Sequence, residues 1–454
     1  MNPILNTDSY KLSHYLQYPK DIKFVNSYIE SRGGRWNRLI FYGLQAFLIK
    51  YLSQKITAEN ISEACEFSKA HGMPFNKQGW EYILKEHGGA LPVSIESLKE
   101  GAIIGTENVL LQVQNTDEKV PWIVGWIETA LLRSIWYPVA VATQSYFCKQ
   151  TILRFLDETG DEADAQFALH DFGARGASSF ESASIGGSAH LLNFGGSDTI
   201  AGALFAMKYY GGQMPAISIP ASEHSTMTAW GKDGEINAFK NMCERFGDGV
   251  FACVIDSYDA LNAIDLWAKN FDEIKKRGGR VVLRPDSGNP VMMASACLER
   301  IMSHTGYSIN DKGYKLLPPF VRLIYGDGIT PESLNDILNE LKMCHISASN
   351  INFGMGGALL QHLNRDTLRF AMKASAISKD GISWQDVFKA PNTDMTKRSK
   401  AGVLALIKKD GVYHTIRADE LKNQKNELEP VFKNGEILRK SSFDEIKARI
   451  IEHS

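Results

Sequence analysis

Two opposite charges follow a short apolar run at residues 281–283 of this sequence. Arg284 and Asp286 stand two positions apart in a turn that also holds Pro285 and Gly288. Proline restricts the residue before it and glycine permits a tight turn, so both charges would be presented with little conformational freedom left to lose. A surface ion pair at the end of a strand has the same composition. The choice between a ligand site and a surface pair depends on whether the arrangement recurs.

Five further apolar runs with the character of strands end in the same kind of turn. Each is followed by Asp, Glu, His or paired glycines, and then by a segment of helical length. In β/α barrels and open α/β sheets, ligand groups collect at the carboxyl ends of the strands. We therefore expect one shared site. The turns are residues 170–176 (HDFGARG), 221–225 (ASEHS), 256–259 (DSYD), 326–328 (GDG) and 354–357 (GMGG).

Several of these groups suit a phosphorylated sugar. Gly356 and Gly357 offer backbone N–H groups that a phosphate can approach closely, although glycine pairs are more often plain turns. Asp286 and Asp327 can accept hydrogen bonds from vicinal hydroxyls or hold magnesium through water. Basic residues that can bind further phosphate oxygens are Arg175, Arg284, Arg365, Lys389, Lys397 and Arg398.

Other groups suit proton or phosphoryl transfer and the stacking of a flat ring. A lone histidine such as His224 is more often structural than catalytic. Asp256 or Asp259, one strand later, would orient and charge it, and such a pair suits proton transfer or acceptance of a phosphoryl group. Phe172 is either a core residue or a platform for a planar ring. Together the groups predict a ligand that combines a phosphorylated sugar with a heteroaromatic ring.

The elements that position these groups fit a barrel better than an open sheet. Neither GxGxxG nor GxxxxGK[ST] occurs, so the dinucleotide and P-loop versions of the open sheet lack their phosphate turn. We count a last apolar run at 368–376 with the barrel strands. Residues 22–150 alternate helical and strand-like patterns, including expected strands at 23–28 and 102–113, and predict an α+β region.

Composition narrows the functional classes. The chain has 454 residues, 44% of them hydrophobic, and 50 basic against 52 acidic residues, so it has no bulk field for nucleic acid or an anionic membrane. Six scattered cysteines without metal-ligand spacing predict reduced thiols and a cytoplasmic location. The N-terminus lacks the pattern of a signal peptide. The apolar stretch 122–142 carries Glu128 and Arg133, which predicts a buried helix rather than a membrane span.

A longer series of motifs carries a family resemblance. The strings TDSYKLSHYLQYP, DFGARG, PASEHSTMTAWGKD, DSYD, RPDSGNP, KGYKLLPP, YGDG, FGMGGALLQ and KRSKAG occur in this order. Residues 7 to 408 thereby resemble the nicotinamide phosphoribosyltransferase family. The resemblance implies a type II phosphoribosyltransferase fold, with an irregular β/α barrel at 150–388 and an α+β domain formed by 1–149 and 389–454. It also implies a homodimer with active sites at the subunit interface.

The implied reaction joins nicotinamide to phosphoribosyl pyrophosphate, giving nicotinamide mononucleotide and pyrophosphate, with magnesium and with ATP as a co-substrate. By resemblance, Phe172 and Tyr10 of the partner subunit sandwich the pyridine ring, and Asp198 accepts a hydrogen bond from the carboxamide. Residues beside the ring are Ser218, Arg284 and Arg175. Residues at the ribose and its 5′-phosphate are Asp286, Gly326, Asp327, Gly356 and Gly357.

The resemblance also assigns the ATP-linked groups. His224 is the histidine that ATP phosphorylates, and Asp259 is its partner. The implied ligands of pyrophosphate and of the ATP phosphates are Arg32, Arg365, Lys373, Lys389 and Lys397. Met355 departs from the family, where a small hydroxyl residue is common before the glycine pair, so a side-chain bond to phosphate is not expected there.

Two other functions compete with this one. The first is the related nicotinate phosphoribosyltransferase activity, against which Asp198 argues because its carboxylate would repel nicotinate. The second is a non-catalytic dimeric binding protein on the same scaffold. Against that reading, the chain keeps the charged groups of the implied site, namely His224, Asp259, Arg284 and Asp286.

Overall fold

The structure is a computed structural model that describes residues 2–391 and 398–452. The chain folds into two compact units. Unit 1 comprises Met1–Ala140, Met207–Gly212 and Asn364–Ser454, and unit 2 comprises Val141–Ala206 and Gln213–Leu363. The sequence-based division differs mainly at residues 364–388, which belong to unit 1.

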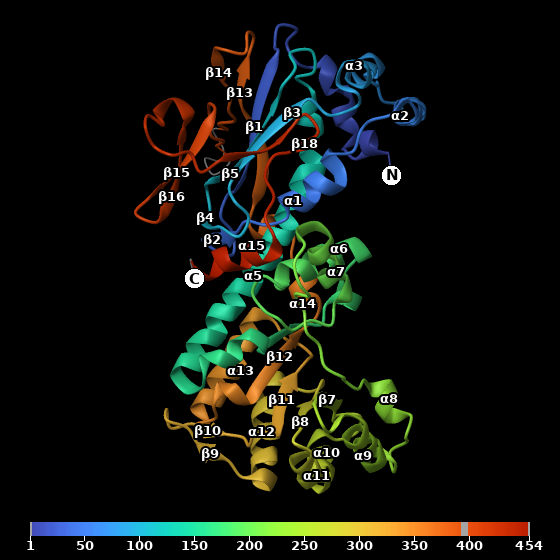
Figure 1. Cartoon of the computed structure of the whole chain (residues 1–454), viewed down its shortest axis with the longest axis vertical. Coiled ribbons are helices and arrows are strands. Elements are labelled where there is room, and N and C mark those ends of the chain that lie inside the picture. Colours follow the sequence, from blue (N-terminus) through green and yellow to red (C-terminus); the bar gives the residue numbers. More distant parts are fainter. Residues whose placement is uncertain (1, 392–397, 453–454) are drawn as a thin grey trace. The chain divides into compact units, whose positions relative to one another are not determined.

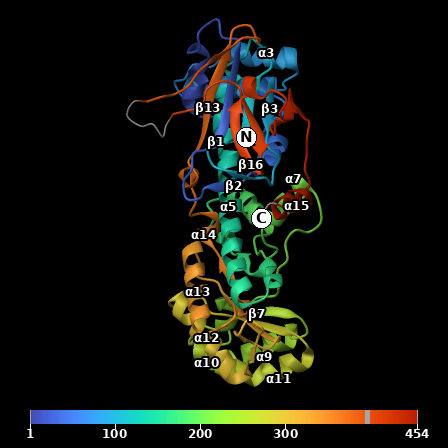
Figure 2. The same ribbon diagram turned by 90° about the vertical axis from the view of Figure 1, so that its left-hand side faces the viewer.

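Unit 1 is built on a seven-stranded antiparallel sheet in the order β14-β13-β1-β5-β3-β17-β18 (Figure 1). Figure 2 shows β13, β1 and β3 from a second side. β1 (Phe24–Ser31) is buried along nearly its whole length, including Asn26 and Glu30, so its polar side chains need partners inside the unit. The other strands are β3 (Val93–Ser97), β5 (Val109–Asn115), β13 (Phe370–Ser378), β14 (Trp384–Asp386), β17 (Glu429–Lys433) and β18 (Glu436–Ile437).

Two antiparallel strand pairs and several helices complete unit 1. Helix α2 begins at a capping box in which the Thr57 hydroxyl accepts from the Asn60 N–H and the Asn60 side chain accepts in return. The pairs are β2 (Arg38–Ile40) with β4 (Ile103–Gly105), and β15 (Leu404–Lys409) with β16 (Val412–Arg417). The helices are η1 (Pro3–Leu5), η2 (Ser9–Leu16), α1 (Leu44–Phe47), η3 (Leu48–Leu52), α2 (Ala58–Ala70), α3 (Lys77–His87), α4 (Ile123–Trp126), η8 (Arg365–Thr367), η10 (Ala418–Glu420) and α15 (Phe443–Ile451).

Unit 2 contains a parallel sheet in the order β6-β12-β11-β8-β7. Its strands are β6 (Leu169–Asp171), β7 (Val250–Val254), β8 (Arg280–Arg284), β11 (Val321–Tyr325) and β12 (Ile351–Met355). Isolated parallel bridges join the two edges of this sheet. They pair Asp171 with Ser197, Gly196 with Ile217, and Ala221 with Ala252. The sheet therefore closes into an irregular barrel whose strands all end on the same side.

The helices of unit 2 follow their strands in the order of a β/α barrel. α12 begins with Pro290 after the Asn289 cap, and α13 begins with Pro331 after the Thr330 capping box, so both starts are fixed by sequence. Helices α5 (Glu128–Thr159) and α7 (Ile200–Tyr210) contribute residues to both units. The others are η4 (Glu162–Phe167), η5 (Ala174–Gly176), α6 (Phe180–His190), α8 (His224–Thr228), α9 (Glu235–Phe246), α10 (Ala260–Trp267), η6 (Ala268–Asn270), α11 (Phe271–Arg277), α12 (Pro290–Thr305), α13 (Pro331–Met343), η7 (Ala348–Asn350) and α14 (Gly357–Leu360), with a short hairpin of β9 (Ser308–Ile309) and β10 (Lys315–Leu316).

Three sequence expectations about elements differ from the structure. The run at 368–376 is not a barrel strand: β13 pairs antiparallel with β1 in unit 1. The run at 102–113 is divided into β4 and β5 by a turn in which Glu107 has a positive φ of 66°. The apolar run that precedes the turn at 221–225 contributes one isolated bridge of the barrel, at Ile217, rather than a full strand.

The apolar stretch 122–142 forms α4 and the first part of α5. In the part of the chain that the structure describes, no helix combines the length and the apolar character that crossing a membrane requires.

Candidate active site

A cavity of about 330 Å³ lies within the barrel of unit 2, and we call it the barrel pocket. Alternate residues of the strands line it, for example Arg280, Val282 and Arg284 of β8, as expected for side chains that point into a barrel. Val282 belongs to a buried apolar cluster with Ala252 and Ile324, against which Phe172 packs. The pocket therefore combines an apolar middle with polar groups at the strand ends.

The ring of Phe172 occupies space that two glycines leave open. A Cβ on Gly354 would lie 2.0 Å from the Phe172 ring, and a Cβ on Gly326 would lie 2.7 Å from the Asp286 carboxylate and 3.3 Å from that ring. The backbone N–H of Phe172 donates to the Met355 carbonyl at 3.0 Å. These contacts bring together three strand ends that the sequence analysis placed in one site, those of β6, β11 and β12.

Asp198 lines the barrel pocket together with Phe172 and Ser218. The Ser218 hydroxyl donates to Asp198 Oδ1 at 2.5 Å, and the Asp198 backbone N–H donates to the Asp171 carbonyl at 3.0 Å. The side chain of Asp198 is exposed to the cavity. This carboxylate is fixed at one oxygen and has a second oxygen with which it can accept from a ligand N–H.

Arg284 and Asp286 form an ion pair of 3.3 Å, and both side chains are largely buried. Burial raises the pKa of Asp286, while Arg284 opposes the rise and Asp256 adds to it. Asp286 Oδ1 and Arg284 Nε are buried without a hydrogen-bond partner within the described residues. Because buried polar atoms normally have partners, these two are the groups best suited to meet a bound ligand.

Asp256, rather than Asp259, contacts His224. Asp256 Oδ1 lies 3.2 Å from His224 Nε2, and Asp256 Oδ2 accepts the backbone N–H of Asp286 at 2.8 Å. Asp259 instead caps helix α10, where its side chain accepts the Asn262 N–H at 2.9 Å. The contact of His224 is therefore with Asp256, whereas the resemblance implied Asp259, and Asp256 links the histidine to Asp286.

The remaining predicted groups of unit 2 lie at neighbouring strand ends. Asp327 is close enough to Asp286 for its negative charge to add to the raised pKa of Asp286. Arg175 belongs to η5, and a Cβ on the adjacent Gly176 would lie 3.1 Å from the Cα of Gly357, so this turn approaches the glycine pair closely. Gly356 immediately precedes α14. Sequence reasoning grouped these residues, and the structure keeps them on one side of the barrel.

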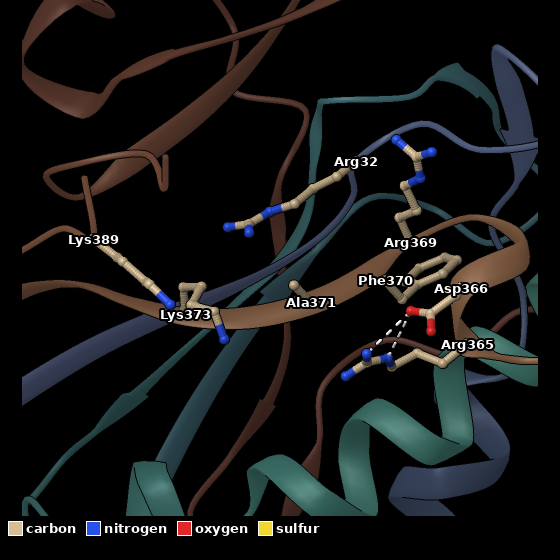
Figure 3. Close-up of a pocket in the computed structure, with 8 residues that line it drawn as sticks. All are labelled: Arg32, Arg365, Asp366, Arg369, Phe370, Ala371, Lys373 and Lys389. Carbon is tan, nitrogen blue, oxygen red and sulfur yellow. Dashed lines mark hydrogen bonds and ion pairs between the residues drawn. The ribbon is translucent and has the colours of Figure 1, made fainter. Parts of the chain in front are cut away.

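A second cavity, of about 600 Å³, lies in unit 1, and we call it the cationic pocket (Figure 3). It is lined by five cations and one carboxylate, and Asp366 is already paired with Arg365 at 3.0 Å. Burial lowers the pKa of Lys373, and the neighbouring charges of Arg32 and Lys389 contribute to the lowering. Such a surplus of positive charge suits a polyanion. The lining residues are Arg32, Arg365, Asp366, Arg369, Phe370, Ala371, Lys373 and Lys389.

Four of the five predicted phosphate ligands lie in the cationic pocket, and the fifth, Lys397, lies outside the described residues. Arg369 was missed. It has a positive φ of 48°, which is uncommon for a residue with a side chain and often marks a functional position. Tyr10 lies in η2 of unit 1, 57% exposed, with its ring 5.2 Å from that of His14. A large exposed aromatic ring is available for contact with a partner.

Comparisons with known proteins identify the fold. A profile of the nicotinate phosphoribosyltransferase (NAPRTase) family matches residues 167–436, and the N-terminal domain of nicotinamide phosphoribosyltransferase matches residues 2–95. The structure is similar to the nicotinate-nucleotide pyrophosphorylase of Pyrococcus furiosus, with a TM-score of 0.65 at 16% identity, covering 99% of this chain and 95% of that one. Human nicotinic acid phosphoribosyltransferase gives a TM-score of 0.61 at 17% identity, covering 98% and 93%. The fold is that of a type II phosphoribosyltransferase, an irregular β/α barrel with a second α+β domain, as predicted.

Relatives in sequence identify the family within this class of phosphoribosyltransferases. The chain is 44% identical to the nicotinamide phosphoribosyltransferase of Xanthomonas campestris pv. campestris, over 98% of this chain and 97% of the relative. It is 34% identical to that of Mycoplasma pneumoniae, over 88% and 94%. The chain belongs to the nicotinamide phosphoribosyltransferase family and is an enzyme. The resemblance read from the motifs is confirmed.

Proposed function

We propose that this enzyme transfers the 5-phosphoribosyl group of phosphoribosyl pyrophosphate to nicotinamide, giving nicotinamide mononucleotide and pyrophosphate. The observation that carries the choice of nicotinamide is the Asp198 carboxylate, held by Ser218 in the same pocket as Phe172. A carboxylate accepts from the amide N–H of nicotinamide and repels the carboxylate of nicotinate. The phenyl ring of Phe172 supplies a flat surface for the pyridine.

The reaction needs orientation more than it needs a base. The pyridine nitrogen of nicotinamide forms a bond to the anomeric carbon, and the bond from that carbon to the pyrophosphate oxygen breaks, so no proton has to move. Positive charge develops on the sugar as pyrophosphate leaves. The buried Asp286 carboxylate of one subunit would bind the ribose, and the cationic pocket of a partner subunit, which includes Arg365, would receive the polyphosphate. Positioning and charge stabilisation therefore account for most of the catalysis.

Magnesium fits this arrangement as an ion carried with the substrate. Within the described residues there is no group of three or more His, Cys, Asp or Glu side chains that would hold a metal by itself. Magnesium is commonly bound by one or two carboxylates together with substrate phosphates. The unpartnered Asp286 Oδ1, with Asp327 nearby, suits that role. When bound, the ion would neutralise the leaving pyrophosphate.

A product assay tests the proposed reaction. Purified enzyme is supplied with phosphoribosyl pyrophosphate, magnesium and either nicotinamide or nicotinate, and the mononucleotide is identified by mass. We expect nicotinamide mononucleotide and pyrophosphate in equal amounts. Exclusive formation of nicotinate mononucleotide would assign the alternative activity, and no product from either pyridine would favour a non-catalytic binding protein.

ATP stimulation is the second part of the proposal. His224 would accept the γ-phosphoryl group of ATP, with a bond forming between a ring nitrogen and phosphorus while ADP leaves. Because Asp256 contacts Nε2, Nδ1 is the nitrogen left for the phosphoryl group. We expect His224→Ala to abolish ATP hydrolysis and stimulation while leaving a slow basal transferase. We expect Asp256→Asn to reduce ATP hydrolysis more than Asp259→Asn does, and equal effects would contradict the geometry seen here.

A homodimer with shared sites is the third part. Unit 2 exposes large apolar side chains on α6 and α7, with Phe180, Ile200 and Leu204 between 56% and 77% exposed. Such a surface is typical of an interface. Tyr10→Ala and Asp286→Ala variants, each inactive alone, should regain part of the activity when subunits exchange, because one site of the hybrid is intact. Verified exchange without recovery would contradict a shared site.

A further inference from the structure

We propose that Glu30 is the positioning residue of the cationic pocket: its buried carboxylate holds Arg32 and, through Lys400 and the adjacent Ser399, the backbone of Lys389. This inference rests on the proposed role of the pocket in binding pyrophosphate. Glu30 does not line the cavity. It lies behind it on β1, where it is 2% exposed.

The first link joins Glu30 to Arg32. Arg32 Nε donates to Glu30 Oε1 at 2.9 Å, and the guanidinium is itself largely buried. Arg32 Nη2 is buried without a hydrogen-bond partner within the described residues. In Figure 3 the guanidinium extends across the pocket toward Lys373 and Lys389. One side of the guanidinium is thus fixed by Glu30, and donors remain on the other side for an anion.

The second link joins Glu30 to Lys400, which comes from the C-terminal part of the chain. Lys400 Nζ donates to Glu30 Oε2 in a short ion pair. The Tyr28 hydroxyl strengthens the attachment, because it accepts the Lys400 backbone N–H at 2.8 Å and donates to Glu30 Oε1 at 3.2 Å. Burial and the neighbouring Glu30 charge raise the pKa of Tyr28 to about 12, so the hydroxyl keeps its proton at neutral pH.

The third link carries the attachment to Lys389. Ser399, which precedes Lys400, is joined to Lys389 by two hydrogen bonds: its N–H donates to the Lys389 carbonyl, and its hydroxyl accepts the Lys389 N–H, both at 2.9 Å. The backbone of Lys389 is therefore tied to a residue that Glu30 and Tyr28 anchor. Two pocket cations from distant parts of the sequence depend on one carboxylate.

Electrostatics explains why a carboxylate is needed behind the pocket. Five cations line the cavity and repel one another before an anion arrives. A buried negative charge that is fully paired lowers this repulsion and holds the cations in place, so that less ordering remains to be done when the anion binds. Replacing Glu30 with glutamine keeps the shape of the side chain and removes its negative charge.

The test compares Glu30→Gln with the wild type by calorimetric titration of inorganic pyrophosphate in the presence of magnesium. We expect at least tenfold weaker binding, as for the loss of charge-assisted hydrogen bonds. In the transferase assay, the KM for phosphoribosyl pyrophosphate should rise about tenfold, whereas the KM for nicotinamide and kcat stay within about threefold. A residue with only a structural role would lower the melting temperature without separating the two KM values.

Two further variants make the result decisive. Glu96→Gln changes a half-buried carboxylate two strands away in the same sheet, and it should bind pyrophosphate like the wild type. Lys400→Gln keeps the pair of Glu30 with Arg32 and should weaken pyrophosphate binding about threefold. This variant replaces Glu30→Gln in the test if Glu30→Gln does not fold. Wild-type affinity in a folded Glu30→Gln, or in Lys400→Gln if it alone folds, would overturn the inference. If Glu30→Gln weakens pyrophosphate binding but the wild type forms no nucleotide, the proposed function is contradicted and the inference about Glu30 is not.

Discussion

The two pockets of this enzyme are built by opposite means. The barrel pocket has an apolar middle of Ala252, Val282 and Ile324, and its polar lining carries both acidic and basic side chains. The cationic pocket has two apolar lining residues, Phe370 and Ala371, and concentrates positive charge from five side chains. The first can discriminate by shape and by the Asp198 carboxylate, and the second can bind any polyphosphate of suitable size.

Two buried ionisable groups illustrate different effects of burial. In unit 2, burial and then the neighbouring His170 lower the pKa of His190 to about 3. In unit 1, the buried Glu30 is paired with two cations, Arg32 and Lys400. We infer that the barrel supplies specificity for the base and that the cationic pocket supplies affinity for the phosphates, and the predictions below separate these roles.

The largest effect is expected for Asp286→Ala. We expect kcat/KM to fall about 10³-fold, because the change removes a buried carboxylate from the proposed ribose site and leaves Arg284 unpaired. Calorimetric affinity for pyrophosphate alone should change less than threefold, since the lining of the cationic pocket does not include Asp286. Asp272→Ala, at an exposed position of α11, is the matched control. Equal losses of turnover and of pyrophosphate affinity would remove the distinction between the pockets.

The next effect concerns the cationic pocket. Arg32→Ala should weaken pyrophosphate binding between tenfold and a hundredfold and make it less sensitive to salt, because a charge-assisted bond is lost. Binding of nicotinamide should stay unchanged. Titrations at two ionic strengths measure this, with Lys379→Ala as a control at the exposed lysine that follows β13. A salt dependence identical to that of the wild type would show that Arg32 does not meet the anion.

A smaller effect tests the neutral interior of unit 2. The His190 ring is fully buried, with Nδ1 2.9 Å from the Ser145 hydroxyl. Burial lowers the pKa of His190 from about 6.5 to about 3, so between these pH values the unfolded chain binds a proton that the folded protein does not. The free energy of unfolding is therefore highest above pH 6.5 and decreases as the pH falls toward 3. At pH 5 the loss is about 2 kcal/mol. Urea unfolding at pH 7 and pH 5 should show a weaker pH dependence for His190→Gln than for the wild type, with exposed His362→Gln as the control.

The sequence predicted the barrel site because its signals are local. Each of the runs that became β6, β7, β8, β11 and β12 is short, apolar and closed by a turn with a charged residue or glycine, and parallel strands bring such turns together. The same reasoning misplaced β13, whose partner β1 lies more than 300 residues away in the sequence. Antiparallel pairing over such a distance leaves no local pattern.

Residue chemistry alone named Arg365 and Lys389 of the cationic pocket as possible phosphate ligands, and the family resemblance added Arg32 and Lys373. The cations of this pocket are scattered from Arg32 to Lys389, and a lone basic residue usually means solvated surface. Glu30 carried one overlooked signal, a charged residue at the end of a strand-like segment. Asp259 carried another: it precedes the apolar helical run of α10, which is typical of a helix cap and could have favoured Asp256 as the partner of His224.

The central claim is that Asp198 selects nicotinamide by accepting a hydrogen bond from its amide. Measuring kcat/KM for nicotinamide and nicotinate, at fixed concentrations of phosphoribosyl pyrophosphate and magnesium, tests this claim. The two pyridines have nearly the same shape, so the like charge facing nicotinate has to separate them, and each 1.4 kcal/mol gives about a tenfold preference. We expect the wild type to prefer nicotinamide by about a hundredfold or more, and Asp198→Asn or Asp198→Ser to narrow that preference mainly by admitting nicotinate. A wild type that uses both equally, or a ratio that the substitutions leave unchanged, would contradict the account.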